Sequence, residues 1–141
     1  MSVTFEMTTD VRRVDMESLA ALYASVGFGT EENYRHPAMT LNRLFGAGVY
    51  GFFAFQGERL VGMARVLSDD VMCSWIAELC VHPDCQRRGI GGALLDRVNE
   101  RFRDTALYAD AFKGQEGFLR SRGIVPQSRL VTCGRAPMKS D

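Results

Sequence analysis

The middle of the chain reads Leu79-Cys80-Val81-His82-Pro83-Asp84-Cys85-Gln86-Arg87-Arg88-Gly89-Ile90-Gly91-Gly92-Ala93-Leu94-Leu95. The apolar residues at its start predict a strand over Trp75–Val81, which ends because Pro83 cannot donate a ladder hydrogen bond. A polar turn with two arginines follows, and a glycine cluster then opens an amphipathic helix over Gly91–Phe102. The segment therefore predicts a strand, a cationic turn and a helix in direct succession.

The turn between this strand and this helix has the chemistry of an anion-binding site. The first N–H groups of a helix lack partners within it, and the helix dipole is positive at that end, so phosphate binds there. Gly89 and Gly91 let the backbone approach a ligand without a Cβ in the way. Arg87 and Arg88 add fixed positive charge. These residues predict a phosphate or pyrophosphate site; the alternative is a plain strand–turn–helix with a surface arginine pair.

Two common phosphate-binding loops are excluded by the residues that follow the glycines. A P-loop needs Lys and then Ser or Thr after its last glycine, whereas Gly91 is followed by Gly92 and Ala93. The dinucleotide-binding fingerprint needs Gly or Ala three residues after its second glycine, and that position here is Leu94. The predicted anion site is therefore of another kind.

Strands and helices also alternate on both sides of this segment. The elements expected before it are a strand at Val3–Thr8, helices at Asp15–Val26 and Thr40–Phe45 with a loop-like Gly27–Ala38 between them, and strands at Val49–Phe55 and Leu60–Leu67 joined by a hairpin turn. The elements expected after it are a strand at Thr105–Ala109, a helix at Gln115–Ser121 and a last strand at Ser128–Thr132. This order predicts an α/β (α+β) fold in which helices pack on a mixed sheet.

Length and composition set the broad class of the protein. A chain of 141 residues fits a single domain over 1–141. Lys plus Arg and Asp plus Glu both number 17, so no excess charge points to nucleic acid or to an anionic membrane as a partner. No apolar run reaches the roughly 18 residues of a membrane helix, and the first residues lack the layout of a signal peptide. We therefore expect a cytoplasmic protein.

Four cysteines are expected to be reduced thiols in that compartment. Cys80, His82 and Cys85 supply three possible metal ligands, but a structural zinc site takes four and no further pair completes the set. The sequence therefore favours buried or partly exposed thiols and predicts no metal. A thiol or zinc protein is the weaker alternative.

The glycine segment resembles a known acetyl-CoA motif. Gln86-Arg87-Arg88-Gly89-Ile90-Gly91 matches the pattern Gln/Arg-x-x-Gly-x-Gly/Ala of the GNAT acetyltransferase superfamily. The preceding Glu78–Pro83 and the following Ala93–Leu95 are similar to the same family, as are Leu60–Val66 and Phe118–Ile124. The resemblance thus extends over most of the chain and is weakest before Gly48.

This resemblance implies a coenzyme site on a mostly antiparallel sheet. Two parallel neighbours, Trp75–Val81 and Thr105–Ala109, are expected to splay apart and admit acetyl-CoA or coenzyme A as a co-substrate. The backbone of Leu79, Cys80 and Val81 would pair with the pantetheine arm like an added strand. The remaining residues expected to contact the coenzyme, chiefly its pyrophosphate, are Gln86, Arg87, Arg88, Gly89, Ile90, Gly91, Gly92 and Ala93.

The implied activity is an acetyl-CoA-dependent N-acetyltransferase. The amine of a small molecule or peptide would attack the thioester directly, with no covalent enzyme intermediate and no required cysteine. Glu31 and Glu32 are candidates for binding a cationic amine, and solvated loop charge is the alternative. An edge strand such as the one expected near Ser128–Thr132 makes a homodimer possible.

Glu78 is the first candidate for the general base. It lies in an otherwise apolar strand, so partial burial would raise its pKa toward the working pH. The alternative is a structural carboxylate paired with a neighbouring arginine, and a bulge between Glu78 and Val81 would decide which face Glu78 occupies. Asp110 and His36 rank lower as bases.

The acid that protonates the leaving thiolate is less clear from sequence. The resembled family often uses a tyrosine in a Phe-Tyr pair on the last helix, and that pair is Phe118-Leu119 here. Tyr108 is the nearest replacement along the chain; the alternative is a strand tyrosine that packs in the core. This departure leaves open a second function, a non-catalytic acyl-CoA-binding or regulatory module.

Overall fold

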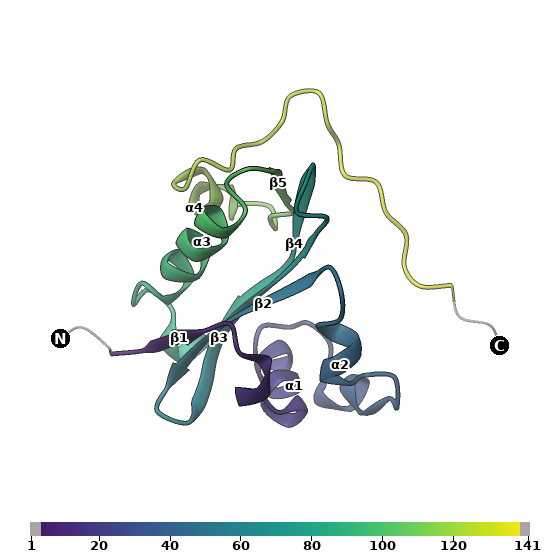
Figure 1. Ribbon diagram of the computed structural model, residues 1–141, viewed down its shortest axis with the longest axis vertical. Helices are drawn as coiled ribbons and strands as arrows, with labels where there is room; N and C mark the ends of the chain where they lie inside the picture. The colour runs from purple at the N-terminus through teal and green to yellow at the C-terminus, as the bar shows by residue number, and fades with distance from the viewer. Residues whose placement is uncertain (1–3, 139–141) are drawn as a thin grey trace.

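The computed structural model describes residues 4–138, in which five strands form a mixed sheet in the order β1-β2-β3-β4-β5 (Figure 1). The strands are β1 (Glu6–Thr8), β2 (Val49–Gln56), β3 (Arg59–Ser68), β4 (Cys73–Val81) and β5 (Ala106–Ala109). Neighbouring strands are antiparallel except for β4 and β5, which are parallel. The predicted fold class, a mostly antiparallel sheet with one parallel pair, is confirmed.

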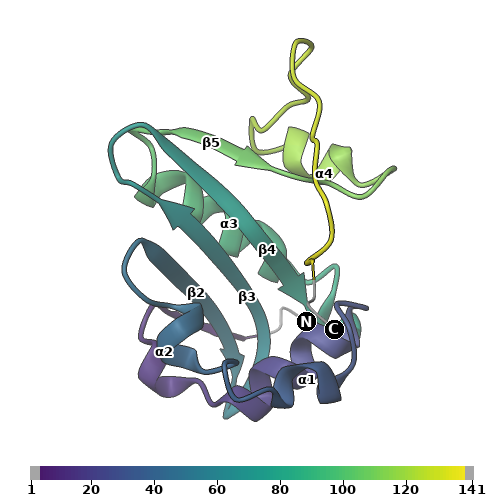
Figure 2. The same cartoon turned by 90° about the vertical axis from the view of Figure 1, so that its right-hand side faces the viewer.

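Helices cover both faces of this sheet (Figures 1 and 2). On one face lie α1 (Met16–Ser25) and α2 (Leu41–Leu44); on the other lie α3 (Ile90–Arg101) and α4 (Glu116–Arg120). Three short 3-10 turns lie at Val11–Arg13, Glu31–Arg35 and Pro83–Cys85. The second of these turns falls within the segment that was expected to be a loop.

Each face of the sheet has its own apolar core. Under α3, the side chains of Leu94, Leu95 and Val98 are fully buried against β2, β3 and β4. Under α1, Leu19 and Leu22 are buried in the same way. Full burial of each such side chain contributes roughly 1.5–3 kcal/mol. The two cores therefore hold the sheet between its helical layers and fix β4, which both cores contact.

The predicted last strand at Ser128–Thr132 is wrong. Residues 130–138 have no regular secondary structure, and Ser128 and Arg129 form a turn instead. The apolar side chains that suggested a strand are exposed, with Val131 at 87%. A strand is stabilised by a partner, and here one side-chain bond, from Thr132 Oγ1 to Asp110 Oδ1 (2.7 Å), ties this stretch to the end of β5. Within the described residues β5 is thus the edge of the sheet.

Candidate active site

The parallel strands β4 and β5 run together for four residues and then separate (Figure 2). Their pairing extends from Cys73 opposite Ala106 to Ile76 opposite Ala109. Beyond this point β4 continues to Val81, and within the described residues β5 does not pair with it. The expected splay of the two strands is therefore present in the structure.

Backbone groups of β4 face this opening. The N–H of His82 donates to the carbonyl of Val61 on β3 (2.8 Å). Because backbone groups alternate in direction along a strand, those of Val81 and Leu79 point away from β3, toward the opening, while those of Cys80 point to β3. The Gln86 side chain donates from Nε2 to the Val81 carbonyl (3.0 Å). Leu79 and the N–H of Val81 thus offer the free edge of the strand, while the Val81 carbonyl is already bonded to Gln86.

The loop after β4 has an unusual backbone. Arg87 has φ +63° and Gly89 has φ +87°, both in the left-handed region that disfavours residues with a Cβ. Arg87 is not a glycine, so its conformation stores strain of the kind that clusters at functional sites. Left-handed residues within a turn aim successive N–H groups into a concave nest that binds anions. This geometry agrees with the phosphate chemistry that the sequence predicts.

The N-terminus of α3 adds free donors to this loop. Gly89 is the N-cap of α3, and no side chain caps its first N–H groups. Arg87 and Arg88 are both exposed beside them. The first turn contains no acidic residue, so nothing there neutralises the positive end of the helix dipole.

The glycines of the first turn also let α4 pack against α3. A Cβ at Gly91 would lie 3.3 Å from the ring of Phe118 and 3.5 Å from Val81. A Cβ at Gly92 would collide with the guanidinium of Arg122, which forms an ion pair with Asp96. The sequence interpretation expected a ligand next to Gly91. In the structure the ring of Phe118 occupies that space.

A bulge in β4 decides which face Glu78 occupies, but it lies just before Glu78 and not between Glu78 and Val81. Arg65 pairs with Glu78 and Val66 pairs with Ile76, so Ala77 is an extra residue in β4. Ile76 joins the core under α3, whereas Glu78 faces α1. Without the bulge both side chains would lie on one face.

Glu78 lies in a hydrogen-bonded network on that face. It accepts the hydroxyl proton of Tyr23 at Oε1 (2.7 Å), and Arg65 Nε donates to both carboxylate oxygens (3.0 and 3.1 Å). A second Arg65 nitrogen, Nη1, donates to the carbonyl of Leu44 (3.1 Å). The side chains of Arg65 and Glu78 are only 21% and 19% exposed. The arginine pairing that the sequence left open is therefore present.

Tyr23 is the member of this network that the sequence did not single out. No local pattern in the sequence marks a contact of Tyr23 with residue 78. Burial, followed by the neighbouring Glu78 carboxylate, raises the pKa of Tyr23. Tyr23 therefore stays protonated and acts as a donor to Glu78 throughout the neutral range.

The possible metal ligands of the sequence are separated in space. Cys80 lies in the core under α1 and Cys85 in the core under α3. His82 Nδ1 accepts the N–H of Asp84 (3.1 Å). Among the residues that the structure describes, no three His, Cys, Asp or Glu side chains are placed to hold a metal ion. Burial, and then Glu78, raises the pKa of Cys80 to about 12, so its thiol is protonated and is a poor nucleophile.

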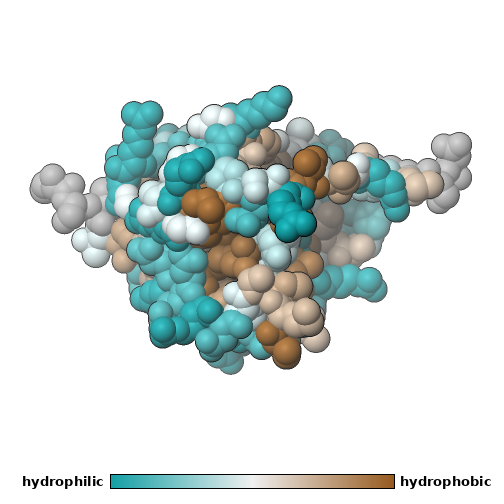
Figure 3. All heavy atoms as spheres, turned by 90° about the horizontal axis from the view of Figure 1, so that it is seen from above, coloured by the Kyte–Doolittle hydropathy of each residue, from teal (hydrophilic) through white to brown (hydrophobic). Residues whose placement is uncertain are grey.

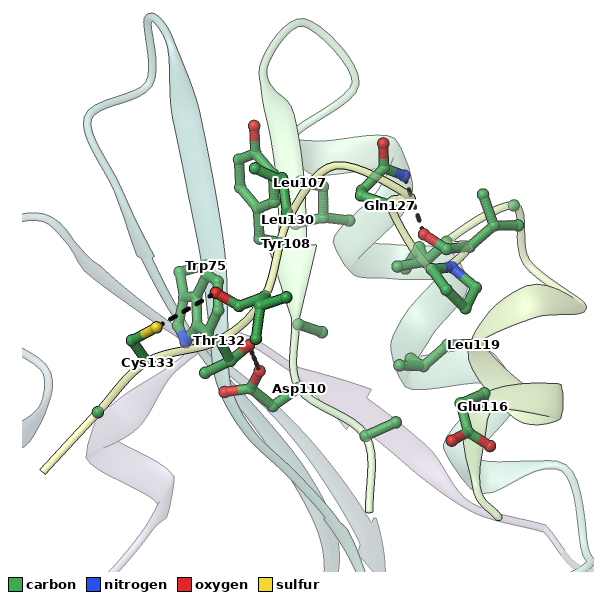
Figure 4. Close-up of a pocket in the computed structure, with 18 of the residues that line it drawn as sticks. Trp75, Leu107, Tyr108, Asp110, Glu116, Leu119, Gln127, Leu130, Thr132 and Cys133 are labelled. Atoms are coloured by element: carbon green, nitrogen blue, oxygen red, sulfur yellow. Dashed lines mark hydrogen bonds between the residues drawn. The ribbon is translucent and has the colours of Figure 1, made fainter. Parts of the chain in front are cut away.

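The other candidate residues make contacts of their own. Tyr108 stacks on Trp75, with ring centroids 6.1 Å apart (Figure 4). Asp110 accepts the Thr132 hydroxyl, and His36 Nδ1 accepts the N–H of Ala38.

A hollow of about 1050 Å³ lies between β5, α4 and residues 123–134. From above (Figure 3), apolar residues reach the surface in the middle of this side of the molecule.

That hollow is distinct from the loop between β4 and α3. Its lining includes Tyr108 and Asp110 but none of the residues from Gln86 to Gly92.

In the described part of the chain, no helix is both long and apolar enough to span a membrane.

Comparisons with known proteins agree with this geometry. Residues 14–121 match the sequence model of the acetyltransferase (GNAT) family. An uncharacterized ycf52-like N-acetyltransferase of Prochlorococcus marinus is 30% identical over 130 residues, which cover 89% of this chain and 71% of that protein.

Solved structures share the fold. A probable acetyltransferase of meticillin-resistant Staphylococcus aureus has a TM-score of 0.73 and 17% identity over 97% of this chain and 100% of that one. A GNAT family acetyltransferase of Streptococcus pneumoniae has a TM-score of 0.68 and 23% identity over 98% of both chains. Since the sequence match runs from before α1 to the end of α4, the chain belongs to the GNAT acetyltransferase family.

Proposed function

We propose that this protein transfers an acetyl group from acetyl-CoA to an amine of a small molecule or peptide. The observation that carries the proposal is the succession of an open strand edge at Leu79 and Val81, a left-handed loop at Arg87 and Gly89, and the uncapped N-terminus of α3. An extended arm fits the strand edge, and a pyrophosphate fits the loop and the helix end. Coenzyme A contains both groups.

Each coenzyme contact has a residue suited to it. The backbone of Leu79 and Val81 would bind the pantetheine arm. The N–H groups from Arg87 to Gly92 would bind the pyrophosphate, with Gln86 fixing the end of the strand through the Val81 carbonyl. The coenzyme supplies an activated thioester, and the protein supplies position and proton transfer.

The reaction is a direct displacement. The neutral amine nitrogen forms a bond to the thioester carbon, the carbon–sulfur bond breaks, and the thiolate takes up a proton as it leaves. Glu78 accepts the proton that the amine loses, directly or through water, and Tyr108 or water protonates the thiolate. The protonated thiol of Cys80 agrees with a mechanism that has no acyl-cysteine intermediate.

A screen of amines tests this function. We expect free thiol to appear when acetyl-CoA and the protein are mixed with an accepted amine, and an acetylated amine to appear in equal amount. Tight binding of coenzyme A without thiol release against a broad panel would instead identify a non-catalytic acyl-CoA-binding module. The lack of a tyrosine at Leu119 is the feature that favours that second function.

Replacing Arg87 and Arg88 together by Ala should weaken coenzyme A binding by about tenfold or more, since charge-assisted hydrogen bonds to phosphate are lost. The binding should also become less sensitive to salt, because fewer charges are screened. Calorimetry between low and high salt measures both effects. Dephospho-coenzyme A shows whether the 3′-phosphate is the group bound.

A matched control is the double replacement of Arg97 and Arg103, two exposed arginines farther along α3 and beyond its end. It removes the same charge from the protein as a whole. An equal loss of affinity in both double variants would show that only overall charge matters and that the loop pair is a solvated surface pair.

Tyr108→Phe tests the proposed acid. Removal of the hydroxyl keeps the stacking on Trp75, so we expect coenzyme affinity to remain and turnover to fall by about tenfold or more. Steady-state kinetics with calorimetry separate the two quantities. Unchanged turnover would assign Tyr108 to packing and the proton transfer to water.

A further inference from the structure

Four aromatic rings form a continuous group on the Glu78 face of the sheet. Tyr23 and Tyr34 stack with ring centroids 5.2 Å apart, and Tyr23 also meets Phe28 at 6.2 Å. Phe28 in turn meets Phe112 at 6.2 Å. Because Phe112 follows β5 and Phe28 follows α1, their contact joins the two sides of the opening where β5 leaves β4.

The backbone holds two of these rings in place. The N–H of Phe28 donates to the carbonyl of Tyr23 (3.0 Å), which anchors the chain at the end of α1. The hydroxyl of Tyr34 donates to the carbonyl of Phe28. Since this hydroxyl is engaged, Tyr34 presents its ring rather than a polar group to its surroundings.

These rings lie beside the Glu78 carboxylate. Tyr23 donates directly to Glu78. Tyr34 stacks on Tyr23, so its ring lies next to the residue that donates to Glu78. Ring contacts therefore connect Phe112 and Phe28, through Tyr23, to the proposed base.

Charge does not explain this surface. Arg65 already compensates the charge of Glu78, and the neighbouring turn carries both acidic and basic residues, Glu31, Glu32 and Arg35. Phe112, by contrast, is 69% exposed and contacts an aromatic ring that is itself only partly buried. A large apolar ring left open at the end of a group of rings that leads to the proposed base is typical of a site that a ligand covers.

We propose that Phe28 and Phe112 bind the body of the acceptor, and that the acceptor is a primary amine carried on an aromatic or flat apolar group. This inference rests on the acetyl transfer proposed above. The flat group stacks on the two rings, and the amine extends to Glu78. Glu78 takes its proton as the nitrogen bonds to the acetyl carbon, and the coenzyme leaves as a thiolate that Tyr108 or water protonates.

A comparison of benzylamine with butylamine tests this subsite. We expect the wild-type protein to have at least about tenfold higher kcat/KM for benzylamine, because aromatic stacking adds to the apolar area that is buried. Phe112→Ala should lower kcat/KM for benzylamine about tenfold, mainly through KM, and change the value for butylamine less than twofold. Phe112→Tyr should retain the preference. The ratio of variant to wild type for each amine cancels the difference in their basicity.

The matched control is Val71→Ala, which shortens another highly exposed apolar side chain, at the β3–β4 hairpin. Saturation-transfer NMR gives a readout that does not need turnover: benzylamine should bind the wild type more strongly than butylamine and lose that advantage in Phe112→Ala. Preferential binding without thiol release would overturn the proposed reaction and leave the subsite intact. The subsite would be overturned if the wild type bound the two amines equally. It would also be overturned if Phe112→Ala and Val71→Ala lost the same affinity for benzylamine.

Discussion

Gly91→Glu is expected to abolish measurable binding of coenzyme A while the protein stays folded. The new carboxylate would lie in the first turn of α3, at the positive end of the helix where the pyrophosphate is proposed to bind. Two anions would then compete for the same N–H groups, and we expect the Kd to rise by at least about 100-fold, roughly 2.7 kcal/mol. Isothermal calorimetry measures this change.

The folded state should tolerate this replacement. An acidic residue in the first turn stabilises a helix by about 0.3–1 kcal/mol, which offsets part of the cost of moving the Phe118 ring away from the new Cβ. Thermal unfolding should therefore shift by only a few degrees. Circular dichroism checks that the helices remain.

Two controls separate charge from shape. Gly91→Ala adds the same Cβ contact without the charge and should lose far less affinity. Gly117→Glu adds the same charge on α4, where a Cβ would meet no atom within 4 Å, and should bind normally. A folded Gly91→Glu protein with wild-type affinity would refute the placement of the pyrophosphate.

Glu78→Gln should lower turnover by about 10²-fold or more and leave the affinity for acetyl-CoA nearly unchanged. An amine with a solution pKa of about 10 is almost wholly protonated at pH 7, and the cation cannot attack a thioester. Gln keeps the size of the side chain and still accepts the Tyr23 hydroxyl, but it cannot take the proton. Raising the pH should partly restore turnover, because solvent then deprotonates the amine.

Glu78 also pairs with Arg65, so the same replacement has a structural effect. It leaves a mostly buried guanidinium without its counter-charge, which costs about 1–3 kcal/mol. The double variant Glu78→Gln/Arg65→Gln removes that unpaired charge and should recover much of the lost stability. If turnover recovers together with stability, Glu78 serves only to compensate Arg65. If stability recovers and turnover does not, Glu78 acts as the base.

Local signals in the sequence are sufficient for most helix ends. Asp15 is the expected start of the first helix, and in the structure it is the N-cap whose carboxylate accepts the N–H of Ser18. Val26, the expected last residue, is the C-cap. The helix expected at Gly91–Phe102 begins one residue earlier, at Ile90, and Phe102 is its C-cap. These predictions hold because caps depend on residues within one turn of the helix end.

The face of Glu78 could not be predicted in the same way. It depends on the extra residue Ala77, and that bulge follows from how β3 and β4 pair rather than from the residues of β4 alone. The contacts of Glu78 with Tyr23 and Arg65 join residues 55 and 13 positions apart in the chain. No local pattern records such contacts.

The error at Ser128–Thr132 has a related cause. β-Branched side chains such as Val131 and Thr132 suit an extended backbone, but a strand also needs a neighbouring edge in register. In the described part of the chain this segment forms a turn at Ser128 and Arg129, and the hydrogen bond from Thr132 to Asp110 holds it near β5. The nearness of Gly91 to Phe118 could not be predicted for the same reason, because it depends on where α4 packs.

The central claim is that the loop after β4 and the first turn of α3 bind the coenzyme. Titration of ¹⁵N-labelled protein with coenzyme A tests it residue by residue. We predict that the largest amide shifts fall at Leu79, Val81 and residues 87–92 and saturate with the Kd found by calorimetry. Shifts concentrated instead around the hollow at residues 123–134, with residues 87–92 unmoved, would contradict the account.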